Sequence, residues 1–229
     1  MLESSSQVHV PPGQHLLLAA SIGGEWVVRP YSPTHIDKRR VELLVKVYEA
    51  QHSIPAGRMS TWLRDRCAIG DELRFKAPCG HIAWTDGRLN VFSVALDLHR
   101  YSFVAGGTGI TPVYAMIRAI LTSKPDAHAR LLYSNKTEKD ILLASDLEQL
   151  AVAHADRFQM CHVITTPDKK GGSEARVLLG RVNRRMVEEV LFAPAPDSTV
   201  MICGPPGMME AVIDVLEKTG YTPSGLLEF

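Results

Sequence analysis

The sequence predicts two successive domains: a small antiparallel β-barrel over residues 1–97 and an α/β domain with a parallel sheet over residues 98–229. The first part has short apolar runs separated by regular turn signals, which favour a barrel. The second part alternates apolar strands with helices, which favours a parallel sheet covered on both faces. The rhythm changes near Leu96 to Arg100, and 229 residues are enough for two domains of ordinary size.

Short strands and one short helix are the expected elements of the first domain. Gly23-Gly24 is a turn signal between two strands. Pro55-Ala56-Gly57 precedes the helix, in which we expect Ser60 to act as the cap. The expected strands are 15–19, 25–29, 41–48, 71–75 and 80–84.

Strands and helices are expected to alternate in the second domain. A glycine-rich turn joins the first strand to the first helix. The expected strands are 101–105, 130–134, 159–164 and 199–203, and the expected helices are 112–121, 141–153, 184–191 and 206–219.

The composition excludes several classes of protein. Lys+Arg and Asp+Glu both number 25, so the chain lacks the basic excess of a nucleic-acid-binding protein. The 4 cysteines form no C-x-x-C pair and no histidine cluster has zinc-ligand spacing, so we expect reduced thiols and no metal. We find no signal peptide and no apolar run long enough to span a bilayer, which predicts a soluble chain.

A rigid segment, Arg29-Pro30-Tyr31-Ser32-Pro33, carries a cation, an aromatic ring and a hydroxyl. Each proline fixes its own φ and pushes the residue before it toward extended geometry. In an extended strand Arg29 and Tyr31 share one face and Ser32 takes the other. That arrangement suits a ligand with an anionic tail and a flat ring, while the alternative is an edge strand that ends in a turn.

Two glycine-rich turns follow predicted strands of the second domain. In Gly106 to Pro112 the glycines permit a close backbone approach, and Pro112 suits the first turn of a helix, whose amides favour a pyrophosphate. A third fingerprint glycine would fall at Pro112, so this is not an ordinary Rossmann fingerprint. Cys203 to Met208 is expected at the same carboxyl edge of the sheet. The alternatives are a tight turn without a ligand and a buried, inert Cys203.

A second anion site is predicted where the short helix of the first domain begins. The backbone amides of Gly57-Arg58-Met59-Ser60, the Ser60 hydroxyl and the Arg58 cation suit a phosphate. An ordinary helix start with a solvated arginine is the alternative.

These segments together resemble the cytochrome-b5 reductase branch of the ferredoxin-reductase-like flavoenzymes. They occur in the family's order and cover nearly the whole chain, so the ordered set is far more specific than any one of them. The resemblance implies an FAD-binding barrel followed by a Rossmann-like nicotinamide-nucleotide domain. The residues that carry it are Arg29 to Pro33, Leu44 to Tyr48, Gly57 to Ser60, Gly106 to Pro112, Asn135 to Leu142, Cys203 to Met208 and Phe229.

The resemblance also implies roles in binding FAD. Arg29 would bind the FAD phosphate, Tyr31 would pack beside the isoalloxazine, and Ser32 would lie near the flavin nitrogen that accepts hydride. Lys46 matches a basic residue of the flavin and nicotinamide region. The segment that wraps the FAD pyrophosphate is matched by Arg58, Met59 and Ser60, and the expected FAD set is completed by Pro30, Val45 and Gly57.

Binding of the nicotinamide nucleotide is assigned by the same resemblance to the second domain. Thr111 would lie between flavin and nicotinamide, and Phe229 matches the family's aromatic terminus. The residues expected closest to hydride transfer are Ser32, Lys46, Thr111 and Cys203. The expected nucleotide-binding set is Gly107, Thr108, Thr111, Pro112, Thr165, Cys203, Gly204, Pro205, Met208 and Phe229.

The implied activity is that of an FAD-dependent reductase. It would take hydride from NADH or NADPH and pass single electrons to cytochrome b5 or a similar haem protein. We expect a monomer in the cytoplasm, or on the cytoplasmic face of the endoplasmic reticulum or mitochondrial membrane where an anchor lies outside this chain. The alternatives are a module of a larger fused reductase, of the cytochrome-b5 oxidoreductase or nitrate-reductase type, and a nucleotide-binding module without flavin.

Two departures from the family pattern affect these expectations. Members normally have a further strand before Pro12-Gly13, so the barrel is expected to lack its first strand and to leave an unpaired edge. NADH-preferring members have an acid after the third strand of the nucleotide domain, where this chain has Thr165, followed by Asp168, Lys169 and Lys170. We therefore expect some use of NADPH, unless Asp168 takes the acid's role.

A short basic run, Lys38-Arg39-Arg40, lies near the flavin segment in the sequence. Such a run can steer an acidic cytochrome to the reductase. A solvated loop is the alternative for so few charges.

Overall fold

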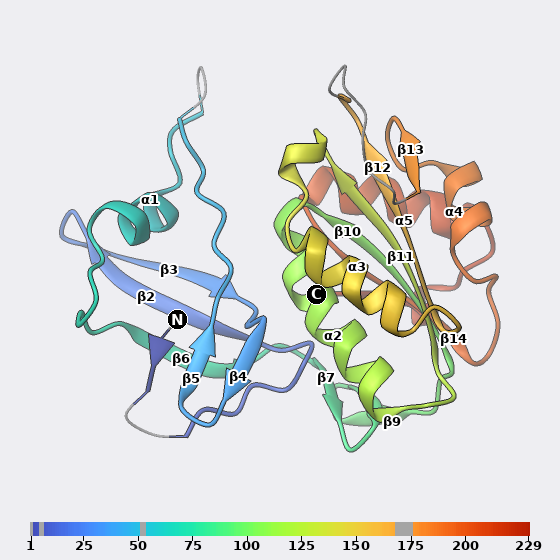
Figure 1. Cartoon of the computed structure of the whole chain (residues 1–229), viewed down its shortest axis with the longest axis horizontal. Helices are drawn as coiled ribbons and strands as arrows, with labels where there is room; N and C mark the ends of the chain where they lie inside the picture. The colour runs from blue at the N-terminus through green and yellow to red at the C-terminus, as the bar shows by residue number, and fades with distance from the viewer. Residues whose placement is uncertain (1, 5–6, 51–53, 168–175) are drawn as a thin grey trace.

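The computed structural model describes residues 2–4, 7–50, 54–167 and 176–229 of the chain. Two lobes lie side by side, the N-terminal one in blue and cyan and the C-terminal one in green to red (Figure 1). The first lobe has antiparallel sheets, and the second has a six-stranded sheet whose paired strands are parallel. The predicted order, an antiparallel domain followed by a parallel α/β domain, is confirmed.

Three-stranded antiparallel sheets account for the strands described before residue 98, in the orders β3-β2-β6, β1-β5-β4 and β7-β8-β9. In β2 every second side chain from Leu16 to Ala20 is buried, as expected for a sheet with one face on a core. The strands are β1 (Leu2–Glu3), β2 (His15–Ile22), β3 (Glu25–Tyr31), β4 (His35–Asp37), β5 (Arg40–Glu42), β6 (Arg74–Cys79), β7 (Ile82–Thr85), β8 (Arg88–Val91) and β9 (Val94–Leu96).

The helix of the first lobe, α1 (Arg58–Asp65), begins at a glycine. Gly57 is the N-cap, no side chain caps the helix, and Ser60 lies in the first turn. The prediction that Ser60 caps this helix is therefore wrong. The cap residue precedes the first turn, and the Ser60 hydroxyl instead donates to the carbonyl of Gly57 at 3.1 Å.

A parallel sheet in the order β13-β12-β11-β10-β14-β15 forms the centre of the second lobe. Helices cover both of its faces, as Figure 1 shows. The strands are β10 (Arg100–Gly106), β11 (His128–Asn135), β12 (Phe158–Ile164), β13 (Val177–Leu179), β14 (Ser198–Cys203) and β15 (Leu226–Glu228). The helices are α2 (Ile110–Ser123), α3 (Ala144–Ala153), α4 (Arg184–Val190) and α5 (Pro206–Lys218), with the 3-10 turns η1 (Gly107–Gly109), η2 (Glu138–Asp140) and η3 (Pro223–Gly225).

Two hydrophobic clusters pack on opposite faces of this sheet. Successive residues of a strand point to opposite faces, so in β11 Leu131 and Tyr133 join the cluster under α2 and α3, whereas Leu132 joins the cluster under α4 and α5. A strand buried on both faces reads as a continuous apolar run, and the predicted strand 101–105 has that character.

The sheet β7-β8-β9 packs against the second lobe. Ile82, Trp84 and Leu89 belong to the same buried cluster as Tyr101 and the helix α2. The Trp84 indole packs edge-on against the Tyr101 ring, with centroids 5.7 Å apart, and its N–H donates to Ser123 Oγ at 2.8 Å. A buried tryptophan with a satisfied N–H is a strong anchor, so this sheet attaches the two lobes to each other.

The predicted strand over 41–48 is too long, because the structure has a strand only as far as Glu42. The ladder of β5 ends at Glu42, which pairs with His35 at the start of β4, and residues 43–50 join no ladder with another described segment. The strand-like alternation nevertheless persists. Leu43, Val45 and Val47 line an apolar groove of about 260 Å³, whereas the side chains of Lys46 and Tyr48 face the second lobe.

Candidate functional site

The two glycine-rich turns meet at the carboxyl edge of the parallel sheet. β10 and β14 are neighbouring parallel strands, with Ala105 opposite Cys203. The contact between the turns is tight, since a Cβ added to Gly109 would lie 2.2 Å from the carbonyl oxygen of Cys203. A Cβ on Gly106 would lie 2.4 Å from Met208 Sδ. The expectation that both turns share one edge is confirmed.

The starts of two helices face this edge. No side chain caps α2 or α5, which begin beside the first and second turn respectively. The Thr111 hydroxyl instead donates to the carbonyl of Thr108 at 3.1 Å within the first turn. The Ile110 amide donates within the preceding 3-10 turn, so α2 continues from that turn. The positive ends of both helix dipoles still lie at this edge, and this arrangement fits the phosphates of a nucleotide.

Tyr133 holds the first glycine-rich turn in place through hydrogen bonds. It was not among the predicted site residues. Its hydroxyl donates to the carbonyl of Gly107 at 3.0 Å and accepts from the amide of Leu142 at 3.2 Å. Burial raises the pKa of Tyr133 to about 12. The phenol therefore stays protonated and holds Gly107, whose φ is +52°, in place.

Cys203 ends β14 and is partly buried. Burial raises the pKa of its thiol to about 11, so the thiolate that nucleophilic chemistry requires is scarce at neutral pH. Gly204 and Pro205 continue the turn, and a Cβ on Gly204 would lie 3.1 Å from Gly106 Cα. The arrangement places Cys203 as a neutral group in a packed wall.

Two further predicted residues lie at the same edge. The amide of Phe229 donates to the carbonyl of Ile202 at 3.1 Å, which places the last residue beside the end of β14. Thr165 follows β12, and its amide donates to the carbonyl of Asn135 at 3.1 Å. Asp168, Lys169 and Lys170 lie outside the described residues.

The predicted flavin segment ends β3 in the first lobe. Arg29 is exposed, and its guanidinium donates to the carbonyl of Val28 at 2.7 Å. Tyr31 is half-buried. Burial raises the pKa of its hydroxyl, and the neighbouring Tyr48 adds to this effect, whereas the nearby Arg29 cation opposes it. Pro30 is exposed, whereas Ser32, immediately after the strand, is partly buried. A cation and a half-buried ring on one strand fit a ligand with an anionic part and a flat part.

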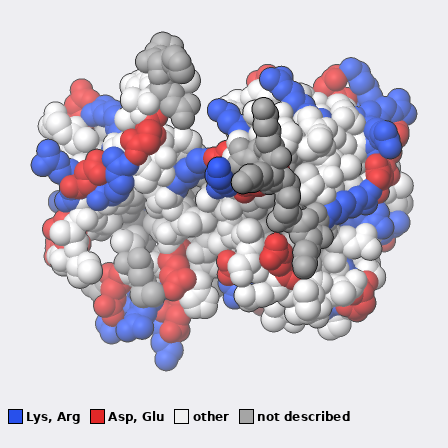
Figure 2. Space-filling model, turned by 45° about the horizontal axis from the view of Figure 1, so that its top comes forward, with Lys and Arg blue, Asp and Glu red and all other residues white. Residues whose placement is uncertain are grey.

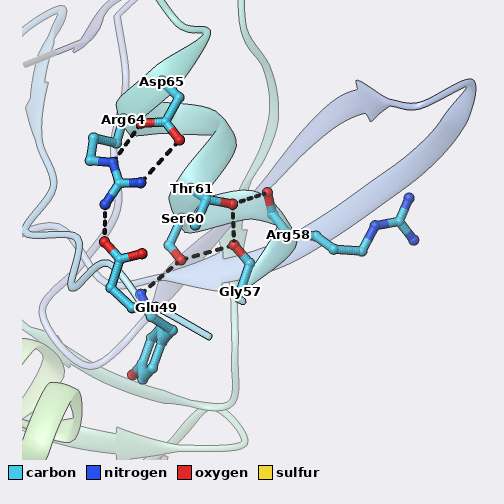
Figure 3. Close-up of polar contacts among 8 residues, drawn as sticks. Glu49, Gly57, Arg58, Ser60, Thr61, Arg64 and Asp65 are labelled. Atoms are coloured by element: carbon cyan, nitrogen blue, oxygen red, sulfur yellow. Dashed lines mark hydrogen bonds and ion pairs between the residues drawn. The ribbon is translucent and has the colours of Figure 1, made fainter. Parts of the chain in front are cut away.

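The start of α1 packs closely on the segment that precedes it (Figure 3). The Ser60 hydroxyl accepts from the amide of Tyr48 at 3.2 Å, and the Thr61 hydroxyl donates to the carbonyl of Gly57 at 2.8 Å. A Cβ on Gly57 would lie 2.7 Å from Ser60 Oγ and 3.1 Å from Tyr48 Cβ, so a larger residue there would displace the Ser60 hydroxyl. Met59 is buried beneath this turn.

Arg58 extends away from these contacts (Figure 3). One guanidinium nitrogen lies 2.9 Å from a carboxylate oxygen of Glu25, and another donates to the carbonyl of Ile22 at 3.0 Å. Of the anion site predicted at Gly57 to Ser60, the amides of the first helical turn are uncapped, but the Gly57 amide donates to the carbonyl of Tyr48 at 2.8 Å and the Arg58 cation is held at the β2–β3 turn.

Two polar contacts join the lobes at the site. Lys46 Nζ lies 2.8 Å from Asp140 Oδ1, and the Tyr48 hydroxyl lies 3.0 Å from Thr108 Oγ1. Lys46 was a predicted site residue, while Tyr48 and Asp140 were not. Tyr48 could have been found from its position two residues after Lys46, because such residues share a face of an extended chain. These contacts bring the first-lobe segments and the glycine-rich turns together.

Charges are mixed over the surface. Acidic and basic side chains are interspersed on the face shown in Figure 2, as expected for a chain with a formal net charge of +0. Lys38, Arg39 and Arg40 are exposed around the turn between β4 and β5. The described residues contain no cluster of histidine, cysteine and acidic side chains able to hold a metal, and no helix among them is long and apolar enough to cross a membrane.

Family models match both parts of the chain. Residues 1–84 match the model of an oxidoreductase FAD-binding domain, and residues 103–214 match that of an oxidoreductase NAD-binding domain. The described fold fits both matches, since the first covers antiparallel sheets and the second covers most of the parallel sheet.

Individual proteins extend the similarity over nearly the whole chain. NADH-cytochrome b5 reductase 1 of Bos taurus is 38% identical over 93% of this chain and 73% of its own length. Nitrate reductase [NADH] of Volvox carteri is 37% identical over 97% of this chain, which spans 26% of that protein. In structure, the cytochrome b5 reductase domain of Ulva prolifera nitrate reductase matches with a TM-score of 0.89 and 32% identity, over 100% of this chain and 88% of that one.

Proposed function

The chain belongs to the NADH-cytochrome b5 reductase family of FAD- and NAD-binding oxidoreductases, and from this premise we propose that the residues at the lobe boundary bring FAD and NADH together for hydride transfer. FAD would be held by the first domain, residues 1–97, and NADH by the second, residues 98–229. The observation that carries the proposal is the contact between Tyr48, which neighbours Tyr31, and Thr108 of the glycine-rich turn.

The first domain supplies the FAD-binding groups. Arg29 provides a cation for the phosphates, Pro30 stiffens the strand, and Tyr31 packs beside the flat ring system, with Ser32 near its reactive edge. The amides of Arg58, Met59 and Ser60, which no side chain caps, would face the pyrophosphate, whereas the Gly57 amide donates to the carbonyl of Tyr48 at 2.8 Å. Lys46, which faces the second lobe, would complete the wall between flavin and nicotinamide, while the side chain of the neighbouring Val45 lines the apolar groove of the first lobe.

The second domain supplies the nucleotide-binding groups. Gly107, Thr108, Thr111 and Pro112 form the first turn, which the hydroxyl of Tyr133 holds in place. The second turn, with Cys203, Gly204, Pro205 and Met208, closes the other side, because a Cβ on Gly109 would clash with the Cys203 carbonyl. Thr165 and Phe229 flank the edge. Of these residues, Thr111 and Cys203 stand closest to the transferred hydride.

The protein's own contribution is alignment. When bound, FAD supplies the step from a two-electron hydride donor to a one-electron acceptor. The side chains orient the two rings and exclude water, and an aligned pair reacts far faster than a free one. Cys203 remains a neutral thiol, since burial raises its pKa to about 11, so it would pack beside the bound rings without giving up its proton.

A haem protein of the cytochrome b5 kind is the proposed electron acceptor. Lys38, Arg39 and Arg40 are exposed and would attract an acidic partner, so reversing these three charges should weaken the dependence of cytochrome reduction on salt. An unchanged salt dependence would contradict this docking role. We propose a monomer in the cytoplasm, or at the cytoplasmic face of the endoplasmic reticulum or mitochondrial membrane, for which sedimentation and cell fractionation are the tests.

An absorbance spectrum tests the proposed function directly. The protein reconstituted with FAD should show flavin bands that bleach when NADH is added without oxygen. Failure to bind FAD would favour the alternative of a nucleotide-binding module without flavin. The other alternative, a module of a larger fused reductase, predicts the same bleaching.

NADPH is proposed as a second hydride donor. Thr165 is exposed at the end of β12, where a hydroxyl does not repel a 2′-phosphate as a carboxylate does. Steady-state kinetics should therefore give measurable reduction with NADPH, and Thr165→Asp should lower it while the uncharged control Thr165→Asn retains it. A thousand-fold preference of the unmodified chain for NADH, about 4 kcal/mol, would contradict the proposal.

A further inference from the structure

An ion pair between the lobes stands apart from the roles proposed above. Lys46 lies in the segment 43–50, which joins no described ladder, and its ammonium lies 2.8 Å from Asp140 Oδ1 in the second lobe. Each side chain is about one-third exposed. A lysine side chain has several rotatable bonds, and the backbone of this segment has no strand partner to hold it. The position of the Lys46 ammonium is therefore set by the Asp140 carboxylate that binds it.

The carboxylate that holds Lys46 is itself fixed. Asp140 closes a capping box on η2, in which its second oxygen accepts from the hydroxyl of Thr137 at 3.0 Å and from the Thr137 amide at 3.3 Å. Its first oxygen is left for Lys46. Asp140 therefore keeps its place through contacts within the second lobe, independently of the lysine.

The same part of the second lobe carries the glycine-rich turn. Tyr133 accepts from the amide of Leu142, two residues after Asp140, and donates to the carbonyl of Gly107. Tyr133 thus connects the segment that carries Asp140 to the turn, and we call these hydrogen-bonded residues the frame of the glycine-rich turn. On the other side, Lys46 and Tyr48 lie on one face of their segment and reach Asp140 and Thr108 respectively.

We propose that Asp140 is a positioning residue for hydride transfer, which acts by fixing the Lys46 ammonium, and with it the segment 45–48, against the frame of the glycine-rich turn. The proposal rests on the proposed function, because it assigns Asp140 a part in aligning the two cofactors. Asp140 touches neither cofactor in this role. Its effect reaches the reacting rings through Lys46 and Tyr48.

The rate of flavin reduction tests the proposal in the FAD-loaded protein. At saturating NADH, Asp140→Asn should lower the rate constant about tenfold, since small misplacements of reacting groups are costly. Asp140→Glu, which keeps the charge, should recover most of the rate. In a Lys46→Met background Asp140→Asn should have no further effect, because the partner is already absent.

Asp197→Asn is the matched control. Asp197 pairs with Arg100 at a similar exposure, with Nε 3.1 Å from Oδ2, but both residues lie within the second lobe. The same substitution there should leave flavin reduction unchanged. Arg118→Met tests loosening of the lobes in general, because Arg118 donates to the carbonyl of Thr34 across the boundary at 3.1 Å without touching the segment 45–48. It too should leave the rate unchanged.

Carbon NMR of the Asp140 carboxyl group supplies a readout independent of activity. In the protein without NADH, Lys46→Met should raise the pKa of Asp140, whereas Asp197→Asn should not. An Asp140 pKa that is insensitive to Lys46 would show that the pair does not form in solution and would overturn the proposal.

The kinetic outcomes separate the two levels of inference. If the unmodified chain binds FAD and is reduced by NADH, but Asp140→Asn reacts at the same rate, the positioning role fails and the proposed function stands. The positioning role would also be overturned if the rate loss of the double variant equalled the product of the losses caused by Lys46→Met and Asp140→Asn alone. Such a product is the result for independent residues, whose free energies add. If the unmodified chain is not reduced by NADH at all, the proposed function itself fails.

Discussion

Gly109→Ala places a methyl group where the two glycine-rich turns touch. The added Cβ would lie 2.2 Å from the carbonyl oxygen and 2.5 Å from the carbonyl carbon of Cys203, whereas real Cβ atoms essentially never come closer than 3.0 Å. The atoms met are backbone atoms at the end of β14, so no side chain can swing aside. One of the two turns must therefore shift by about 1 Å, as overpacking of a dense interior requires.

Such overpacking costs about 1–3 kcal/mol in free energy of unfolding. For a chain of this size each kcal/mol lowers the melting temperature by about 2–4 °C, so the variant should melt roughly 2–12 °C below the unmodified protein. Because the clash lies in the second lobe, the flavin content should be unchanged, whereas the affinity for NADH should fall.

Calorimetry of the FAD-loaded protein and NADH titration of its flavin absorbance measure both effects. Gly207→Ala is the control, because it adds the same methyl in the first turn of α5 with nothing within 4 Å. Alanine is favoured over glycine in a helix, so this control should leave the melting temperature unchanged or raise it slightly. Equal melting temperatures and NADH affinities for the two variants would refute the close contact between the turns.

Tyr133→Phe removes the hydroxyl that contacts Gly107 and Leu142 and should cost about 1–3 kcal/mol in urea unfolding; an unchanged midpoint would contradict the bracing role. Cys203, with its pKa raised to about 11, should be alkylated by iodoacetamide at pH 8 about two hundredfold more slowly than in the unfolded chain, as mass spectrometry can measure; equal rates would contradict its burial. The Lys46 contact lowers the pKa of Asp140, so its contribution to stability is present above the ordinary value of about 3.9 and is lost as pH falls through the lower folded value. The melting difference between the unmodified chain and Asp140→Asn should hold from pH 7 to about 5 and shrink below about 4; a difference that shrinks already near pH 6 would contradict it.

The alternating second domain was predictable because its strands are buried on both faces. The predicted strands 101–105, 130–134, 159–164 and 199–203 all lie within β10, β11, β12 and β14. Continuous apolar runs of that length followed by turn signals are the pattern that such strands produce.

The hairpin of β8 and β9 was missed for a physical reason. Its turn places Phe92 and Ser93 at φ of +47° and +66°, a conformation that Asn-Gly pairs normally signal. The His81 ring stacks on Phe92 with centroids 4.4 Å apart, and the His81 carbonyl accepts the Phe92 amide at 2.9 Å. A contact between residues distant in sequence thus sets the turn, and local patterns do not report it.

The candidate site also contains residues that local sequence patterns place and residues that only contacts between distant segments place. The glycine-rich turns could be placed from sequence, because neighbouring parallel strands end at one edge of their sheet. Tyr48 and Asp140 could not, because their partners lie 60 and 94 residues away in the sequence and in the other lobe. Ser60 was placed at the start of α1, but its exact position within the first turn depends on the fit of Gly57 against Tyr48.

The two-sided segment 43–48 has a consequence for changes in chain length. Leu43, Val45 and Val47 line the apolar groove, and Lys46 and Tyr48 face the second lobe. Deleting residue 44 would exchange the two faces of the segment on one side of the deletion. Either apolar side chains would then meet Asp140, or an ammonium would enter the groove. Deleting two residues would leave each remaining side chain on its present face. Although it has no ladder, this stretch should therefore tolerate insertions and deletions in steps of two far better than in steps of one.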